Sequence, residues 1–123
     1  MGYKVLVAED DNFLMSAYST KLAKEGFEFK IASDGEEVLE ILKTFTPDVL
    51  LLDLVMPRKD GFAVLEEIKK MDGFKDIPVI VTSNLGQKED IDRAMALGAR
   101  DFITKSNLSM SDLVEKIKSV AAK

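Results

Sequence analysis

Short apolar runs alternate with longer amphipathic stretches along the whole chain. Continuous runs of Val, Ile, Leu and Phe are typical of strands that are buried on both faces of a parallel sheet. The runs predict five strands, which are Val5–Ala8, Phe27–Ala32, Val49–Asp53, Val79–Thr82 and Phe102–Thr104.

The remaining stretches predict five helices, because their apolar residues recur at helical spacing. The first helix is expected over residues 12–25, with Gly26 as its C-terminal cap and Tyr18 on its apolar face. The boundaries of the others are marked by capping sequences, glycines and a proline, namely Ser33-Asp34-Gly35-Glu36, Pro47, Gly73, Gly98, and Ser109 with Asp112.

Strands that alternate with helices imply right-handed crossovers and a parallel sheet covered by helices on both faces. The predicted fold class is therefore α/β, a three-layer, doubly wound (βα)5 sheet of the flavodoxin-like kind. The pattern alone does not give the strand order, but 2-1-3-4-5 is the usual solution at this size. The 123 residues contain no evident linker or repeat, so a single domain over residues 1–123 is expected.

Charge and composition exclude several kinds of function. The chain has 22 acidic and 17 basic residues, a balance that argues against general affinity for nucleic acid. It has neither Cys nor His, which excludes disulfides, thiolate or imidazole metal sites and imidazole catalysis. A metal ion would have to be bound by oxygen atoms. Neither a secretory signal nor a membrane span is evident, so a cytoplasmic protein without membrane insertion is expected.

Polar residues gather where the predicted strands end. The first strand is followed by Glu9-Asp10-Asp11, the third ends in Asp53, the fourth in Thr82-Ser83, and the fifth in Thr104-Lys105-Ser106. The carboxyl ends of parallel strands share one edge of the sheet, where ligands bind. Carboxylates, a hydroxyl and a lysine suit magnesium and phosphoryl transfer. Asp53 is the best candidate for a carboxylate nucleophile, since it stands alone on its strand.

These motifs together resemble the receiver domain of bacterial two-component response regulators. The resemblance extends from Lys4 to about Val120 and rests on Glu9-Asp10, Asp53 with Pro57 and Gly61, Thr82, and Lys105. It implies that Asp53 is the phosphoacceptor. It also implies a Mg²⁺ site, with Mn²⁺ as the alternative ion. Its ligands would be Asp53, Asp10 directly, Glu9 mostly through water, and the backbone carbonyl of Val55.

The resemblance further implies a switch. Thr82 would turn toward the phosphoryl group, Lys105 would bridge to its oxygens, and Phe102 falls at the family's switch aromatic. The surface of the fourth helix, fifth strand and fifth helix would then change. The implied partners are a sensor histidine kinase or phosphotransfer protein and a downstream effector, with the chain a monomer or a phosphorylation-linked homodimer. No output domain is expected within residues 1–123, so a stand-alone receiver that acts by contact with partners and a receiver excised from a longer protein both stay open. No enzymatic activity beyond its own phosphorylation and dephosphorylation is expected.

The chain departs from the family's pattern in two places. Ser106 stands where the family usually has a proline that is often cis, so we predict a trans bond after Lys105. Val55 and Asn84 occupy the two positions that flank the path of the hydrolytic water in this family. Because Val55 has no polar group to orient that water, a phosphorylated state of intermediate to long lifetime is predicted.

Each of these residues also has a purely structural interpretation. Asp11 is expected to cap the first helix, Thr82 could be an ordinary strand-end hydroxyl, and Phe102 could be plain core. Arg58, Lys59 and Asp60 fit a solvated turn, although Arg58 could attract an anionic donor.

Three other functions compete with the signalling switch. A degenerate receiver would serve as an interaction module without phosphorylation. A small aspartyl-phosphate phosphatase would commonly have a second Asp where this chain has Val55. A flavodoxin-like cofactor binder would need a phosphate-binding loop after the first strand, where this chain is acidic instead.

Overall fold

The computed structural model describes residues 2–84, 87–107 and 109–122. Its sheet has five parallel strands in the order β2-β1-β3-β4-β5, which confirms the flavodoxin-like order. The strands are β1 (Lys4–Ala8), β2 (Glu28–Ala32), β3 (Val49–Asp53), β4 (Val79–Ser83) and β5 (Asp101–Thr104).

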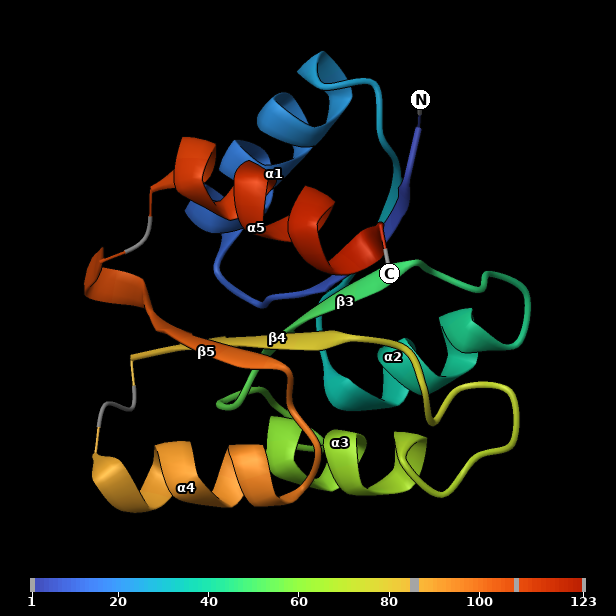
Figure 1. Ribbon diagram of the computed structural model, residues 1–123, viewed down its shortest axis with the longest axis vertical. Helices are drawn as coiled ribbons and strands as arrows, with labels where there is room; N and C mark the ends of the chain where they lie inside the picture. Colours follow the sequence, from blue (N-terminus) through green and yellow to red (C-terminus); the bar gives the residue numbers. More distant parts are fainter. Residues whose placement is uncertain (1, 85–86, 108, 123) are drawn as a thin grey trace.

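Helices cover both faces of this sheet, as predicted. They are α1 (Asn12–Lys24), α2 (Gly35–Leu42), α3 (Gly61–Ile68), α4 (Lys88–Ala96) and α5 (Met110–Ala121), with a short 3-10 helix, η1 (Lys105–Asn107), after β5. Helices α1 and α5 lie on one side of the sheet, and α2, α3 and α4 lie on the other (Figure 1). The architecture is therefore a three-layer sandwich.

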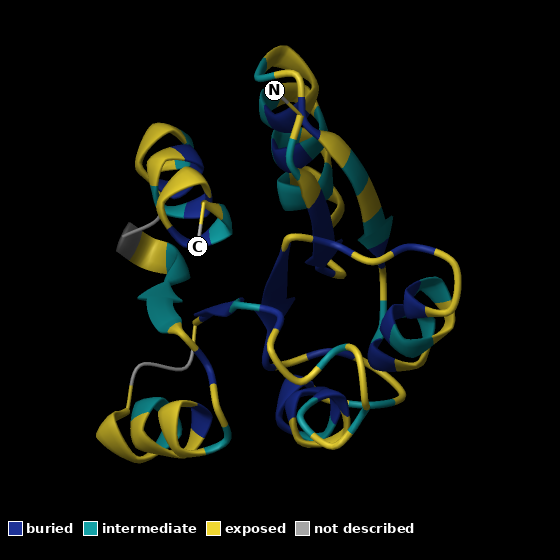
Figure 2. Ribbon diagram, turned by 45° about the vertical axis from the view of Figure 1, so that its right-hand side comes forward, coloured by how far each residue is buried: buried dark blue, intermediate teal, exposed yellow. Residues whose placement is uncertain are grey.

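The core consists of two apolar clusters separated by the sheet. Successive side chains of a strand point to opposite faces, so each central strand contributes to both clusters. Leu50 and Leu52 pack toward α2, α3 and α4, whereas Leu51 packs toward α1 and α5. Figure 2 shows the central strands β1, β3 and β4 mostly buried, the edge strands β2 and β5 less so, and the outer faces of the helices exposed. Because β1, β3 and β4 are buried on both sides, they provide a firm support for the residues that follow their carboxyl ends.

Three predicted helix boundaries needed correction. The cap of α2 is Asp34, whose carboxylate accepts a hydrogen bond from the Glu37 amide, one position later than the predicted Ser33–Glu36 box. The Glu37 carboxylate in turn accepts from the amide and hydroxyl of Ser33. Helix α2 ends at Leu42, well before Pro47, and α3 ends at Ile68 rather than near Gly73.

The segment before α3 is a largely exposed turn, as predicted, and it also contains the cap of α3. Asp60 is the N-cap of α3 and accepts a hydrogen bond from the Ala63 amide. Arg58 has a positive φ of 68° and pairs with Asp34 across 3.1 Å. The loop after β3 is thereby anchored to the start of α2.

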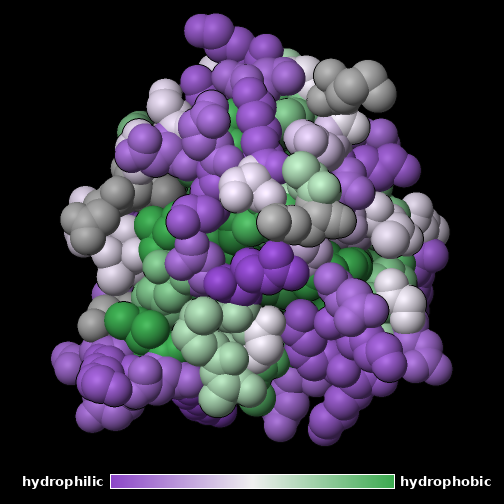
Figure 3. Space-filling view, in the orientation of Figure 1, coloured by the Kyte–Doolittle hydropathy of each residue, from purple (hydrophilic) through white to green (hydrophobic). Residues whose placement is uncertain are grey.

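The surface is mainly hydrophilic. In Figure 3, hydrophilic residues cover most of the visible face, and hydrophobic side chains show mainly around its middle. Among the described residues, no helix is long and apolar enough to cross a membrane.

Candidate functional site

The carboxyl ends of β1, β3 and β4 bring the predicted site residues together. Asp53 lies opposite Thr82 in the register of β3 and β4, and Ala8 lies opposite Leu52, which places Glu9 beside Asp53. The Glu9 amide still donates to the carbonyl of Ala32, so the ladder extends to this residue. A cleft of about 250 Å³ opens at this edge, lined by Asp10, Asp11, Asp53, Val55, Asn84 and Lys105.

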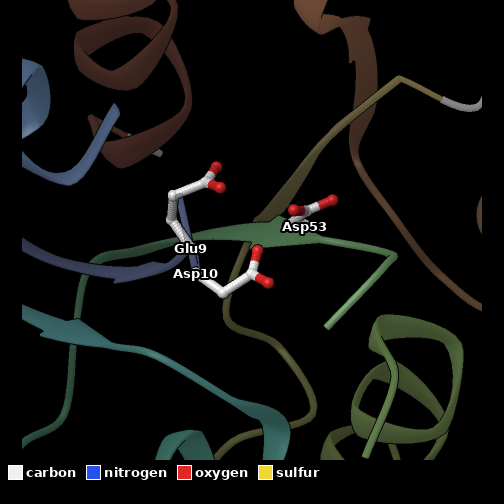
Figure 4. A group of neighbouring side chains, drawn as sticks. All are labelled: Glu9, Asp10 and Asp53. Carbon is white, nitrogen blue, oxygen red and sulfur yellow. The ribbon is translucent and has the colours of Figure 1, made fainter. Parts of the chain in front are cut away.

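Three carboxyl groups meet at the cleft. Glu9, Asp10 and Asp53 each contribute an oxygen, and these oxygens lie within 4.8 Å of one another. Figure 4 shows Glu9 and Asp10 reaching from the end of β1 and Asp53 from the end of β3. The exposed fraction is 0% for Glu9 and 3% for Asp53, whereas Asp10 is exposed at the mouth of the site. Two of the three carboxyl groups are thus interior, and one faces solvent.

Lys105 supplies a positive charge between two of these carboxylates. Its ammonium lies 2.8 Å from Asp53 Oδ2 and 2.9 Å from Glu9 Oε2, and only 11% of its side chain is exposed. The pairing with Asp53 fits the predicted role of a compact cation. The pairing with Glu9 was not anticipated from the sequence. Every peptide bond among the described residues is trans, including the one after Lys105, as predicted.

Burial shifts the ionisation of the whole group. Desolvation raises the pKa of Glu9 and that of Asp53 above their ordinary values, although the bonds to Lys105 offset part of the rise. Burial alone would lower the pKa of Lys105, but its bonds to the two carboxylates raise it instead. The two carboxylates therefore bind protons more strongly than free carboxylates do.

Backbone groups hold the end of β3 in place. Asp53 Oδ1 accepts a hydrogen bond from the Val55 amide at 3.2 Å, and the Gly61 amide donates to the Leu54 carbonyl at 2.8 Å. A Cβ at Gly61 would lie 2.3 Å from the carbonyl oxygen of Asp53. Only glycine therefore lets the start of α3 approach the end of β3 this closely.

The donor set fits a small, hard divalent cation. Glu9 Oε1 is buried and has no hydrogen-bond partner among the described residues. The other oxygen of the same carboxylate, Oε2, accepts hydrogen bonds from Lys105 and from the Asp11 amide, the latter at 3.1 Å. A buried carboxylate oxygen without a partner is costly unless a cation or water satisfies it. Carboxylate oxygens are the ligands that Mg²⁺ and Mn²⁺ prefer.

Two other predicted residues lie at different depths. Thr82 is 1% exposed and lies beside Asp53 on the neighbouring strand, and it is not among the residues that line the cleft. Phe102 is half-buried and packs against the cluster on the α2, α3 and α4 side, so it lies away from the carboxylates. Asp11 caps α1 as expected, since its carboxylate accepts from the Leu14 amide.

One residue of the site was missed by sequence reasoning. Tyr18 of α1 is 1% exposed, and the pKa of its hydroxyl responds to the neighbouring Thr82 and to the charges of Glu9, Lys105 and Asp53. The periodicity identified its ring as core but said nothing of the hydroxyl. A tyrosine within an otherwise apolar helix face is the signal that was available, because a buried tyrosine hydroxyl needs a polar neighbour.

Comparisons with known proteins agree with this geometry. A family model for the response regulator receiver domain matches residues 5–118. Response regulator RR06 of Streptococcus pneumoniae serotype 2 is 40% identical over 116 residues, which cover 94% of this chain and 52% of that protein. Chemotaxis protein CheY of Treponema pallidum is 36% identical over 121 residues, which cover 96% of this chain and 82% of that protein. The chain spans about half the length of several curated relatives it matches.

A solved structure shares the fold. The receiver domain of sensor histidine kinase PA1611 from Pseudomonas aeruginosa PAO1 matches with a TM-score of 0.90 and 19% identity, covering 100% of both chains. That structure has a magnesium ion coordinated in its active site cleft.

Proposed function

The chain belongs to the family of response regulator receiver domains, and we propose that residues 1–123 form a receiver unit that accepts a phosphoryl group on Asp53. Receiver domains act as switches in two-component signalling. The proposed donor is a phosphohistidine on a sensor histidine kinase or phosphotransfer protein, and the proposed reader is a downstream effector. The observation that supports this most strongly is the Lys105 ammonium bound between the buried carboxylates of Glu9 and Asp53 at the cleft.

The proposed reaction is a transfer between two nucleophiles. An oxygen of the Asp53 carboxylate attacks the phosphorus atom, a phosphorus–oxygen bond forms, and the phosphorus–nitrogen bond to the imidazole breaks. The imidazole nitrogen keeps the electron pair and takes a proton from solvent. Asp53 is held for this by its bond from the Val55 amide and by Lys105.

A divalent cation completes the proposed site. Glu9, Asp10, Asp53 and the Val55 carbonyl are the groups we propose as its ligands, with Mg²⁺ as the ion. When bound, it would neutralise charge on the carboxylates and on the transferred group. Lys105 supplies a second, permanent positive charge, and its burial keeps that charge from being screened by solvent.

We propose Thr82 and the surface of α4, β5 and α5 as the part that responds. Helix α4 has one buried residue, Ala94, whereas α3 has five, so α4 is less firmly held to the sheet. Elements with few buried apolar contacts move at the lowest free-energy cost. Phe102 on β5 packs on the same side of the sheet as α4, which is consistent with a role in relaying the change. Amide hydrogen exchange with and without beryllofluoride and magnesium tests this proposal. It expects changes over residues 88–96 and 101–121, and changes confined to other segments would contradict it.

The lifetime of the phosphorylated state is proposed to depend on Val55 and Asn84. Both line the cleft, and Val55 is 56% exposed. Because valine cannot orient a water, Val55→Asn is expected to shorten the half-life of phosphorylated protein, measured by loss of the added mass over time. An unchanged rate would rule out this role for Val55.

The central proposal is tested by intact-protein mass after incubation with acetyl phosphate, with and without magnesium. We expect a magnesium-dependent gain of one phosphoryl group that is absent in Asp53→Asn. Asp48→Asn is the matched control, because Asp48 precedes the same strand at its opposite, exposed end. A gain that survives in Asp53→Asn, or that is lost equally in the control, would contradict the assignment of Asp53.

A further inference from the structure

Tyr18 carries a polar group for which the resting structure provides no use. Its side chain is buried in the middle of α1, and its hydroxyl has no hydrogen-bond partner among the described residues. Buried tyrosine hydroxyls usually find a partner, and leaving one unpaired costs about 1–3 kcal/mol. Leucine or phenylalanine would fill the same volume without that cost. We therefore look for a hydrogen-bond partner of this hydroxyl in another state of the protein.

Thr82 faces the same side of the sheet as the Tyr18 side chain. Ile80 belongs to the apolar cluster that contains Tyr18, and Thr82 lies two residues further along β4, so it faces the same side of the sheet. Burial raises the pKa of Tyr18 to about 12, and the neighbouring Thr82 hydroxyl offsets part of that rise. At neutral pH, the Tyr18 hydroxyl is thus protonated and can donate a hydrogen bond toward Thr82.

A threonine hydroxyl can serve two neighbours at once. It donates one hydrogen bond and accepts up to two. If Thr82 donates its proton toward a phosphoryl oxygen on Asp53, its own oxygen is left free to accept. On this side of the sheet, the Tyr18 hydroxyl is a buried donor that has no hydrogen-bond partner among the described residues. Bonds linked in such a chain polarise and strengthen one another.

We propose that Tyr18 is a positioning residue for Thr82, whose oxygen accepts the Tyr18 proton when Thr82 turns toward a phosphoryl group on Asp53. This inference rests on the proposed function of the site. In the resting state the Tyr18 hydroxyl lies near Thr82 but makes no hydrogen bond of ordinary geometry. In the phosphorylated state that bond is complete, so the hydroxyl biases the switch toward the phosphorylated arrangement. The bias is expressed through Thr82, and Tyr18 itself does not touch the reacting atoms.

The test uses beryllofluoride with magnesium as the phosphoryl analogue and titration calorimetry as the readout. Tyr18→Phe removes only the hydroxyl and is expected to weaken beryllofluoride binding about 3- to 10-fold, the range that one hydrogen bond supports. In the Thr82→Ala background, the same change is expected to have no further effect. Tyr3→Phe is the matched control, because it removes the chain's other tyrosine hydroxyl, which lies before β1 at the opposite end of the strand. It is expected to leave binding unchanged.

Folding is followed in parallel by urea denaturation without beryllofluoride. Tyr18→Phe is expected to be as stable as the wild type or more stable. If the hydroxyl had only a structural role, weaker beryllofluoride binding would be accompanied by a loss of stability. The inference would be overturned, and the proposed function left intact, by either of two results. One is unchanged or tighter beryllofluoride binding in Tyr18→Phe, and the other is a loss of affinity from Tyr18→Phe that persists in the Thr82→Ala background. Failure of the wild type to bind beryllofluoride would overturn the proposed function and the inference with it.

Discussion

The middle of the sheet and its carboxyl edge are equally buried but opposite in chemistry. Val7, Leu51 and Ile80 sit side by side in the middle of β1, β3 and β4 with an exposed fraction of 1% or less. Two residues further along the same strands, Glu9, Asp53 and Thr82 are buried to within 3% of completely. The strands present both rows of side chains to the same face, so neither depth nor direction distinguishes them.

The difference lies in what burial does to each row. Apolar side chains gain about 25 cal/mol for each Å² removed from water. Carboxylates lose the free energy of hydration, and their bonds to Lys105 and to backbone amides compensate for only part of that loss. The middle of the sheet therefore stabilises the fold, and the edge holds charged groups at a cost in stability. Two residues along a strand separate the two roles.

The largest expected effect comes from the middle row. Leu51→Ala removes a fully buried side chain between α1 and α5, and we expect it to lower the free energy of unfolding by about 3–4 kcal/mol. Urea denaturation measures this. Once folded, the variant should still accept a phosphoryl group, because the edge is unchanged. Val55→Ala is the control for lost aliphatic volume at an exposed site, and an equal loss there would contradict the comparison.

The next effect comes from removing the charge that holds the edge together. Lys105→Met leaves Glu9 and Asp53 buried side by side without a cation, and it should lower the free energy of unfolding by about 2–3 kcal/mol in EDTA. Lys88→Met is the matched control, since Lys88 pairs with Asp92 on the exposed face of α4, and its removal should change stability little. Similar losses in both variants would mean that burial adds nothing to the Lys105 pairs.

The sequence predicts the middle row more completely than the edge. Unbroken apolar runs such as Leu50–Leu52 identify buried strands by themselves, and alternation with helices then leads to the parallel sheet. The edge residues could be assigned to one cluster because parallel strands end together. Which of these side chains form ion pairs could not be predicted, because that depends on how far each side chain reaches. Lys105 bridges to Glu9 across the whole width of the site, 96 positions away in the chain.

Tyr18 and Asp60 show two further limits of the sequence pattern. The helical spacing of apolar residues indicates which residues face inward, but it does not indicate which groups a tyrosine hydroxyl will lie next to. A charged residue before a glycine, such as Asp60, is equally consistent with a solvated turn and with a helix cap. Asp60 became a cap because the start of α3 is drawn close to β3 at Gly61.

A smaller effect of opposite sign is expected from neutralising the edge. Glu9→Gln keeps the shape of the side chain and removes a buried charge, so it should raise the free energy of unfolding at neutral pH by about 1 kcal/mol in EDTA. Burial raises the pKa of Glu9 above 4.5, so the folded wild type binds its proton more tightly than the unfolded chain does. The wild type therefore loses stability as pH rises from about 4.5 through the raised pKa, and the advantage of Glu9→Gln should grow over that window.

The pH dependence gives this prediction its own control. Glu28→Gln changes an exposed glutamate at the start of β2 and should alter neither stability nor its pH profile. A Glu9→Gln variant that is less stable than the wild type at neutral pH would show that the Lys105 bond outweighs the cost of burying the charge.

The most direct test of the account is the free energy of unfolding of Asp53→Asn beside the wild type, at neutral pH, in EDTA and in saturating magnesium. We expect Asp53→Asn to be more stable by about 0.5–2 kcal/mol in EDTA, because a buried charge has been removed. Magnesium should stabilise the wild type more than the variant and narrow this gap. A variant that is less stable in EDTA, or magnesium stabilisation that is equal in both proteins, would contradict the claim that the carboxyl edge gives up stability to bind a cation and accept a phosphoryl group.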